Sequence, residues 1–137
     1  MLKALLKGTH YTVDAVDLGS VADTGVAIDQ VMRQAIQKCD LIVTTGGVSM
    51  GELDLIKPYI EQRGEVFFGR LNMKPGKPTT FGVVRDETSQ RESLIFGLPG
   101  NPVSCYVTAT LFLDLALKTL AGSHPDLLPH TEVTLLP

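Results

Sequence analysis

Apolar and polar residues alternate along the chain in segments that predict helices and strands in turn. After Val26 the apolar positions recur at helical spacing, which predicts an amphipathic helix of about three turns. These positions are Ile28, Val31, Met32, Ala35 and Ile36. Residues 103–120 predict the longest helix, and because it is apolar nearly all round it must pack on more than one side.

Two shorter helices are also predicted. One, near the start of the chain, is expected to stop at Gly8, and the other spans residues 53–62. Pro58 falls inside the second of these segments. Either this helix begins with Pro58 in its first turn, or the proline kinks it.

Strand-like segments lie between these helices. Residues 41–43 form a continuous apolar run that is typical of a parallel strand covered on both faces. Residues 85–93 are polar and mixed in charge, so they predict an exposed turn. Further strand-like segments are 13–18, 66–71, 79–84 and 94–96. Strands that alternate with helices predict an α/β fold, namely a three-layer α/β/α sandwich around a mostly parallel sheet.

Length and charge limit the classes of function. A chain of 137 residues forms one ordinary domain. A domain of this size buries roughly 68% of its unfolded surface and needs no disulfide or metal to hold its core. The net charge of −3 provides no general attraction to a polyphosphate backbone, which disfavours nucleic-acid binding. Charged or turn residues interrupt every apolar run before the roughly 18 residues of a membrane span, so no membrane insertion is expected.

The two cysteines indicate a reducing compartment. Cys39 and Cys105 lie far apart, and each falls within an apolar run. This pattern favours two buried free thiols over a disulfide. Free thiols fit a cytoplasmic protein.

Three loops rich in glycine, proline and polar residues follow predicted strands, and α/β sheets bind ligands outside the carboxyl ends of their strands. In the first loop, residues 44–54, glycines let the backbone approach a ligand. The N–H groups at the start of the next helix can hold an anion. The alternative is a plain turn whose glycines relieve crowding and in which Asp54 caps the helix.

The second loop, residues 73–78, presents two lysines three positions apart. Pro75 and Pro78 stiffen the backbone around Lys74 and Lys77, so both charges are presented with little ordering cost on binding. This arrangement suits a phosphate or another oxyanion. A solvated turn at the edge of the sheet is the alternative.

The third loop, residues 98–104, resembles the first in design. Gly100 leaves room for a ligand, Asn101 offers a donor and an acceptor, and Pro102 suits the first position of the long helix. Ser104 and the free N–H groups of that helix can cap either an anion or the helix itself.

Acidic residues complete the candidate site. Asp23 follows one predicted strand, and Glu52 and Asp54 follow another, so two loops can aim carboxylates at one rim. Paired acids can hold Mg²⁺ on a phosphate, although Asp23 can equally be a turn residue. Together the loops predict a site for a small anionic molecule at the edge of an α/β sheet.

The strings TTGGVSMGELD, NMKPGKPTTF and GLPGNPVS, in this order and spacing, resemble the molybdenum-cofactor biosynthesis family. The resemblance is closest to the molybdopterin molybdenumtransferases, which include the gephyrin E domain. The segments VDLGSVADTG and LFLDLALKTLAG fit the same pattern, so the resemblance covers nearly the whole chain. The related molybdopterin adenylyltransferases share the fold and a GG loop but continue differently after it, so GGVS with a later Asp favours the molybdate-inserting branch.

The resemblance implies that molybdate is inserted into adenylylated molybdopterin in the presence of Mg²⁺, with release of AMP. It also implies roles for single residues, of which Asp54 and Asp23 would be the catalytic acids near the metal or the molybdate. Lys74 and Lys77 would contact oxyanions. The pterin-phosphate side would be lined by Thr45, Gly46, Gly47 and Ser49. The opposite wall would be formed by Pro99, Gly100, Asn101, Pro102 and Ser104.

The resemblance further divides the chain. Residues 1–122 correspond to a molybdopterin-binding α/β domain that lacks the family's first strand and one acid of its site, so the chain alone is expected to bind weakly and not to turn over. Residues 123–137 correspond to a linker and the start of a C-terminal subdomain. Family members imply a homodimer of the full-length protein and an upstream adenylyltransferase domain or protein. A gephyrin-like receptor-anchoring module, a molybdopterin adenylyltransferase of the same fold and an inactive structural module remain alternatives.

Overall fold

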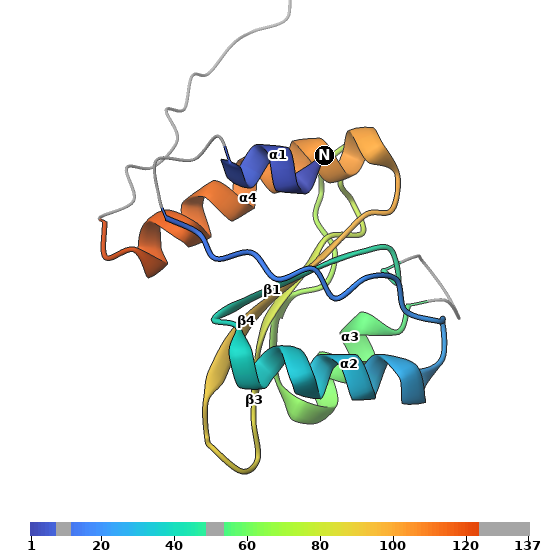
Figure 1. Cartoon of the computed structure of the whole chain (residues 1–137). Helices are drawn as coiled ribbons and strands as arrows, with labels where there is room; N and C mark the ends of the chain where they lie inside the picture. Colours follow the sequence, from blue (N-terminus) through green and yellow to red (C-terminus); the bar gives the residue numbers. More distant parts are fainter. Residues whose placement is uncertain (8–11, 49–53, 124–137) are drawn as a thin grey trace, which may run out of the picture.

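The computed structural model describes residues 1–7, 12–48 and 54–123, which contain four helices and four strands. In chain order the elements are α1 (Leu2–Lys7), α2 (Gly25–Lys38), β1 (Leu41–Thr45), α3 (Ile56–Arg63), β2 (Gly64–Phe68), β3 (Thr80–Arg85), β4 (Glu92–Leu98) and α4 (Pro102–Leu120). The strands form one sheet in the order β1-β4-β3-β2. Helices α2 and α3 cover one side of this sheet, and α1 and α4 lie on the other (Figure 1). The α/β class and the three layers predicted from the sequence are confirmed.

The sheet is mixed, which corrects the expectation of a mostly parallel sheet. Strands β1 and β4 are parallel, whereas β3 is antiparallel to both of its neighbours, β4 and β2. The physical reason lies in the connections, because a parallel neighbour requires a crossover of roughly a dozen residues or more, usually with a helix. Only the short predicted turn joins β3 to β4, and no helix lies between β2 and β3. The exposed turn therefore closes a hairpin.

The strand directions place three connections at one edge of the sheet. Strands β1 and β4 run the same way. Strand β2 also runs this way, because it is separated from β4 only by the antiparallel β3. The carboxyl ends of β1, β2 and β4 consequently lie at the same edge, and this edge carries all three loops that the sequence singled out.

One core lies between the sheet and helices α2 and α3. Helix α2 buries four of its predicted apolar positions, which are Ile28, Met32, Ala35 and Ile36. Thr24 caps the start of this helix by accepting a hydrogen bond from the Ala27 amide. At the other end, the buried Ser93 hydroxyl of β4 donates to the carbonyl oxygen of Cys39 at 2.7 Å. This bond fastens the end of α2 to the sheet.

The second core lies under α4, where Cys105, Ala109 and Leu113 pack with Phe96 and Leu98 of β4. Among the described helices, α4 is long and apolar enough to cross a membrane, which corrects the expectation that charged or turn residues interrupt every apolar run. One face of α4 packs against the sheet, and 33% of its most apolar stretch is buried. Both cysteines are free thiols, as predicted, but Cys39 is only partly buried, whereas both were expected to be buried. Cys105 is buried, and burial raises the pKa of its thiol.

Two further sequence predictions are settled by the structure. The prediction of a strand at residues 13–18 is wrong, because these residues form no strand in the structure. Val16 is 53% exposed, and β-branched residues form strands only where a partner strand and an apolar surface receive them.

Helix α3 begins at Ile56, so Pro58 lies in its first turn, which was one of the two predicted options. Helix α1 ends at Lys7, and Gly8 lies outside the described residues.

Candidate functional site

The first and third loops lie side by side because β1 and β4 are neighbours. Thr45 pairs with Leu98 across the two strands, and the Gly46 amide donates to the Leu98 carbonyl at 2.9 Å. Gly46 has a φ of +88°, a conformation that favours glycine. A Cβ on Gly100 would lie 3.5 Å from the Gly46 Cα. The two loops thus present bare backbone to a ligand at this edge.

Gly47 and Asp54 organise the start of α3. The Gly47 carbonyl accepts hydrogen bonds from the Leu55 amide at 2.9 Å and the Ile56 amide at 3.2 Å. The Asp54 Oδ1 atom accepts from the Lys57 amide at 3.2 Å. Asp54 therefore caps a helix, which was the plain alternative for this residue, and Oδ2 is not used in that cap.

Asn101 caps α4 in the same way. Its Oδ1 atom accepts hydrogen bonds from the amides of Val103 and Ser104, each at 3.1 Å. Pro102 occupies the first helical position, as predicted. Because the first amides of α4 are already engaged, an anion at this helix start must displace the Asn101 carbonyl or bind elsewhere on the rim. Pro99, just before this turn, is buried.

The KPGKP loop (residues 74–78) follows β2 and exposes both lysines, Lys74 and Lys77. Its backbone is ordered by internal hydrogen bonds. The Thr79 amide and hydroxyl both donate to the Gly76 carbonyl, at 3.0 and 2.6 Å. The Leu71 amide donates to the Lys77 carbonyl at 2.9 Å. The two amines are therefore carried into solvent by a fixed turn, as an oxyanion-binding loop requires.

The two acids lie on the same side of the molecule. Asp23 is exposed and directly precedes the cap of α2. The starts of α2 and α3 are both on the side of the sheet where β1 ends (Figure 1). Within the described ranges, no group of three or more His, Cys, Asp or Glu side chains could hold a metal ion. Mg²⁺ usually takes one or two carboxylates and completes its shell with phosphate oxygens and water, so Asp23 and Asp54 suit it only together with a phosphate-bearing ligand.

Residues 49–53 of the first loop, Ser49 and Glu52 among them, lie outside the described residues. The sequence pattern also missed one residue, Lys57, that contacts the start of the connection between β2 and β3. Its side-chain Cδ and Cε atoms lie 2.9 and 3.0 Å from the position of a Cβ on Gly69, at the beginning of the connection that carries the KPGKP loop. The sequence carried no signal for this contact, because Gly69 is distant from Lys57 along the chain.

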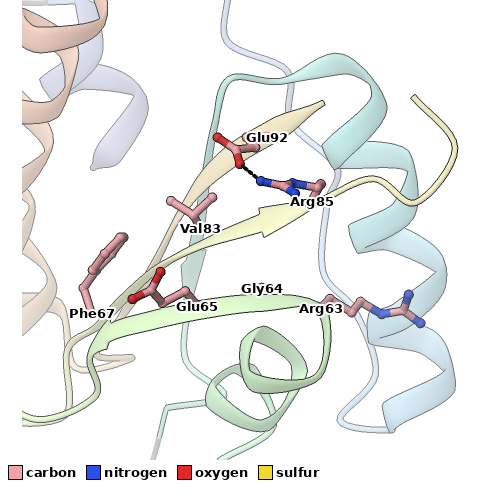
Figure 2. Close-up of a pocket in the computed structure, with 7 residues that line it drawn as sticks. All are labelled: Arg63, Gly64, Glu65, Phe67, Val83, Arg85 and Glu92. Carbon is pink, nitrogen blue, oxygen red and sulfur yellow. Dashed lines mark hydrogen bonds and ion pairs between the residues drawn. The ribbon is translucent and has the colours of Figure 1, made fainter. Parts of the chain in front are cut away.

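A separate hollow of about 490 Å³ lies on the sheet toward the other end of the strands (Figure 2). It is open and shallow, and its Arg85 and Glu92 side chains pair with each other. The lining residues are Arg63, Gly64, Glu65, Phe67, Val83, Arg85 and Glu92. None of them belongs to the three loops, so the glycine and lysine loops remain the better candidate site.

The sequence comparisons agree with the loop pattern. Residues 1–119 match the family described as "Probable molybdopterin binding domain". The chain is 44% identical over 115 residues to a protein named gephyrin from Dictyostelium discoideum, covering 77% of this chain and 16% of that protein. It is 39% identical over 121 residues to a molybdopterin molybdenumtransferase from Haemophilus influenzae, covering 88% and 28%. The chain thus spans less than a third of the length of these relatives.

The solved structures support the fold. A molybdenum cofactor biosynthesis protein from Pyrococcus furiosus superposes with a TM-score of 0.63 at 24% identity, covering 90% of this chain and 36% of that one. The tungsten cofactor synthesizing protein MoaB from the same organism superposes with a TM-score of 0.54 at 18% identity, covering 74% and 70%. With its three loops at one sheet edge and this match over most of its length, the chain belongs to the molybdopterin-binding domain family of molybdenum cofactor biosynthesis proteins.

Proposed function

We propose that this chain is the pterin-binding domain of a protein that inserts molybdate into adenylylated molybdopterin and releases AMP. The main support for this proposal is that the Gly46 and Gly100 backbones lie in contact, at the same edge of the sheet as the KPGKP loop. The relatives named molybdopterin molybdenumtransferase support it.

The chemistry requires that negative charge be neutralised where a phosphoanhydride breaks. Lys74 and Lys77 carry the exposed amines suited to that task. The bare backbone at Gly46 and Gly100 suits close approach of the pterin phosphate. In this scheme an oxygen of molybdate attacks the adenylate phosphorus, and the phosphoanhydride P–O bond breaks with the pterin phosphate as the leaving group. AMP then departs with the attacking oxygen when its Mo–O bond breaks as the pterin takes up the molybdenum.

The acids suit positioning better than proton transfer. The Asp54 Oδ1 atom accepts a hydrogen bond from the Lys57 amide at the start of α3, and this bond orients the second carboxylate oxygen. Asp23 and Asp54 would hold Mg²⁺ together with substrate oxygens. The ion, when bound, supplies charge neutralisation at the phosphates.

We further propose that the full-length protein acts in the cytoplasm as a homodimer and receives its substrate from an adenylyltransferase domain or protein. The two free cysteines support a reducing compartment. The substrate requires such a supplier, because an adenylate must be formed before it can be cleaved.

Complementation of a cofactor-deficient strain by the full-length protein tests the function. Wild type is expected to restore cofactor production, and Asp54→Ala is expected to lose it. Asp54→Asn is the matched control for folding, because asparagine caps helices as well as aspartate but carries no charge. The thermal unfolding temperature of this variant is expected to equal that of the wild type, and the variant is still expected to fail to complement the strain. Complementation by Asp54→Asn at the wild-type level would contradict the assignment of Asp54, and failure of the wild type would contradict the function itself.

A further inference from the structure

Thr108 lies in the middle of α4, and its side chain is fully buried. Its hydroxyl donates to the Ser104 carbonyl oxygen at 2.8 Å, in the preceding turn of the helix. Its Cγ2 methyl group lies only 2.5 Å from the position that a Cβ on Gly76 would occupy. One side chain therefore contacts both the first part of α4 and the KPGKP loop.

Gly76 is fitted to this contact. It is buried, and its φ of +113° is a conformation that side chains rarely adopt. The Sδ and Cε atoms of Met73 also lie 3.1 Å from the same Cβ position, so Gly76 is enclosed between Met73 and Thr108. Its carbonyl accepts both hydrogen bonds from Thr79 that close the loop. The loop backbone thus rests directly on the Thr108 methyl group.

We propose that Thr108 is a positioning residue whose methyl group holds the KPGKP loop against α4. The contact fixes Lys74 and Lys77 relative to the first turn of α4, where Asn101 meets the glycine loops. The packing contact is independent of any ligand, but its importance for substrate binding rests on the proposed function. Thr108 touches no substrate in this scheme and acts through the placement of the two lysines.

Two substitutions separate the methyl contact from the hydroxyl bond. Thr108→Ser keeps the hydroxyl that bonds to Ser104 and removes the methyl group next to Gly76. Thr108→Val keeps a methyl group at that position and removes the hydroxyl. A positioning role predicts that serine is the harmful replacement, whereas a role in bonding within the helix predicts that valine is.

Amide hydrogen exchange in the full-length protein measures directly how stably the KPGKP loop keeps its hydrogen bonds. The amides of Leu71 and Thr79 report it, because they donate to Lys77 and Gly76. Thr108→Ser is expected to speed their exchange about fivefold, the effect of losing one buried methyl group, and Thr108→Val is expected to change it little. Equal exchange in the two variants, or faster exchange in the valine variant alone, would overturn the proposal.

Steady-state kinetics then test the consequence for the lysines. Thr108→Ser is expected to raise the KM for adenylylated molybdopterin about fivefold with a smaller change in kcat, and Thr108→Val is expected to stay near wild type. An unchanged KM in a serine variant whose loop exchanges faster would refute the role in substrate positioning. If the wild-type protein shows no turnover, the proposed function fails, and the exchange experiment alone still decides whether Thr108 holds the loop.

Discussion

Asn101 and Asp54 each combine a local structural task with a place in the candidate site. The Asn101 carbonyl caps α4, and the Asp54 carboxylate caps α3. Both caps depend on an oxygen acceptor, whereas recognition of an anion or a metal depends on charge. Substitutions that keep the acceptor and change the charge can therefore separate folding from binding at each position.

At Asn101 the informative change adds a negative charge. Asn101→Asp keeps a good cap, so the thermal unfolding temperature of the full-length protein is expected to stay at the wild-type value. Its added carboxylate at the rim is expected to weaken binding of adenylylated molybdopterin about tenfold in a calorimetric titration, a modest electrostatic cost near a protein surface. Asn101→Ala is the complementary control, expected to cost about 1 kcal/mol of stability through the lost cap. Wild-type affinity in the aspartate variant would argue against an anion site here.

Among the secondary-structure elements, β3 packs closely against both β2 and α3 at Gly82. A Cβ on Gly82 would lie 2.4 Å from the Glu65 carbonyl oxygen in β2 and 2.7 Å from the Ile60 Cγ2 atom in α3. The strand can approach β2 and α3 only because position 82 has no side chain. At Gly100, by contrast, the nearest atom to a Cβ is 3.5 Å away, which is ordinary contact.

This difference predicts opposite outcomes for two alanine substitutions. Gly82→Ala is expected to lower the free energy of unfolding by about 1–3 kcal/mol, because the strand must move away from its neighbours. Gly100→Ala is expected to change it by no more than about 0.5 kcal/mol, as is usual at an exposed position. Urea unfolding of the full-length protein measures both. Equal destabilisation by the two changes would show that the enclosure of β3 has been overestimated.

On the scale of the whole molecule, an ionic cluster joins α2 to α3. The Arg33 Nε atom donates to one oxygen of Asp29 at 2.7 Å, and Arg63 donates to the other at 2.5 Å. The hydrogen bond from Arg33 and the charges of both arginines lower the pKa of the Asp29 carboxyl from its ordinary value of 3.8. The contact between α2 and α3 is therefore favoured by the ionised form of Asp29.

The sign of the pH dependence follows from this shift. A carboxyl whose pKa is lowered in the folded state contributes stability above its unfolded pKa and loses it as the pH falls through the folded pKa. Asp29→Asn is expected to be less stable than wild type at neutral pH and to approach it below the ordinary pKa of 3.8. Thermal unfolding measured across this range checks the expectation. A constant difference between the two proteins at every pH would mean that the ion pair does not contribute.

Much of the fold could be predicted because local patterns determine it. The helical spacing in α2 and the apolar run in β1 describe how each segment meets a core, and both were found. The direction of β3 depends instead on how short its connections are, and residues 13–18 had strand propensity without a partner strand. At the site, the three loops could be located from the rule for strand ends. Lys57 and Thr108 could not, because their importance comes from contact with Gly69 and Gly76, which are distant in sequence.

Helix α4 also acts as a spacer within the candidate site. From Asn101, beside the glycine loops, to Thr108, beneath the KPGKP loop, the helix rises by about 10 Å, or two turns. The number of residues between these two positions therefore sets the separation of the two halves of the site. Deletion of one residue would shorten this separation by about 1.5 Å and rotate position 108 by about 100° away from Gly76. The number of intervening residues must therefore stay constant for both halves to face one ligand.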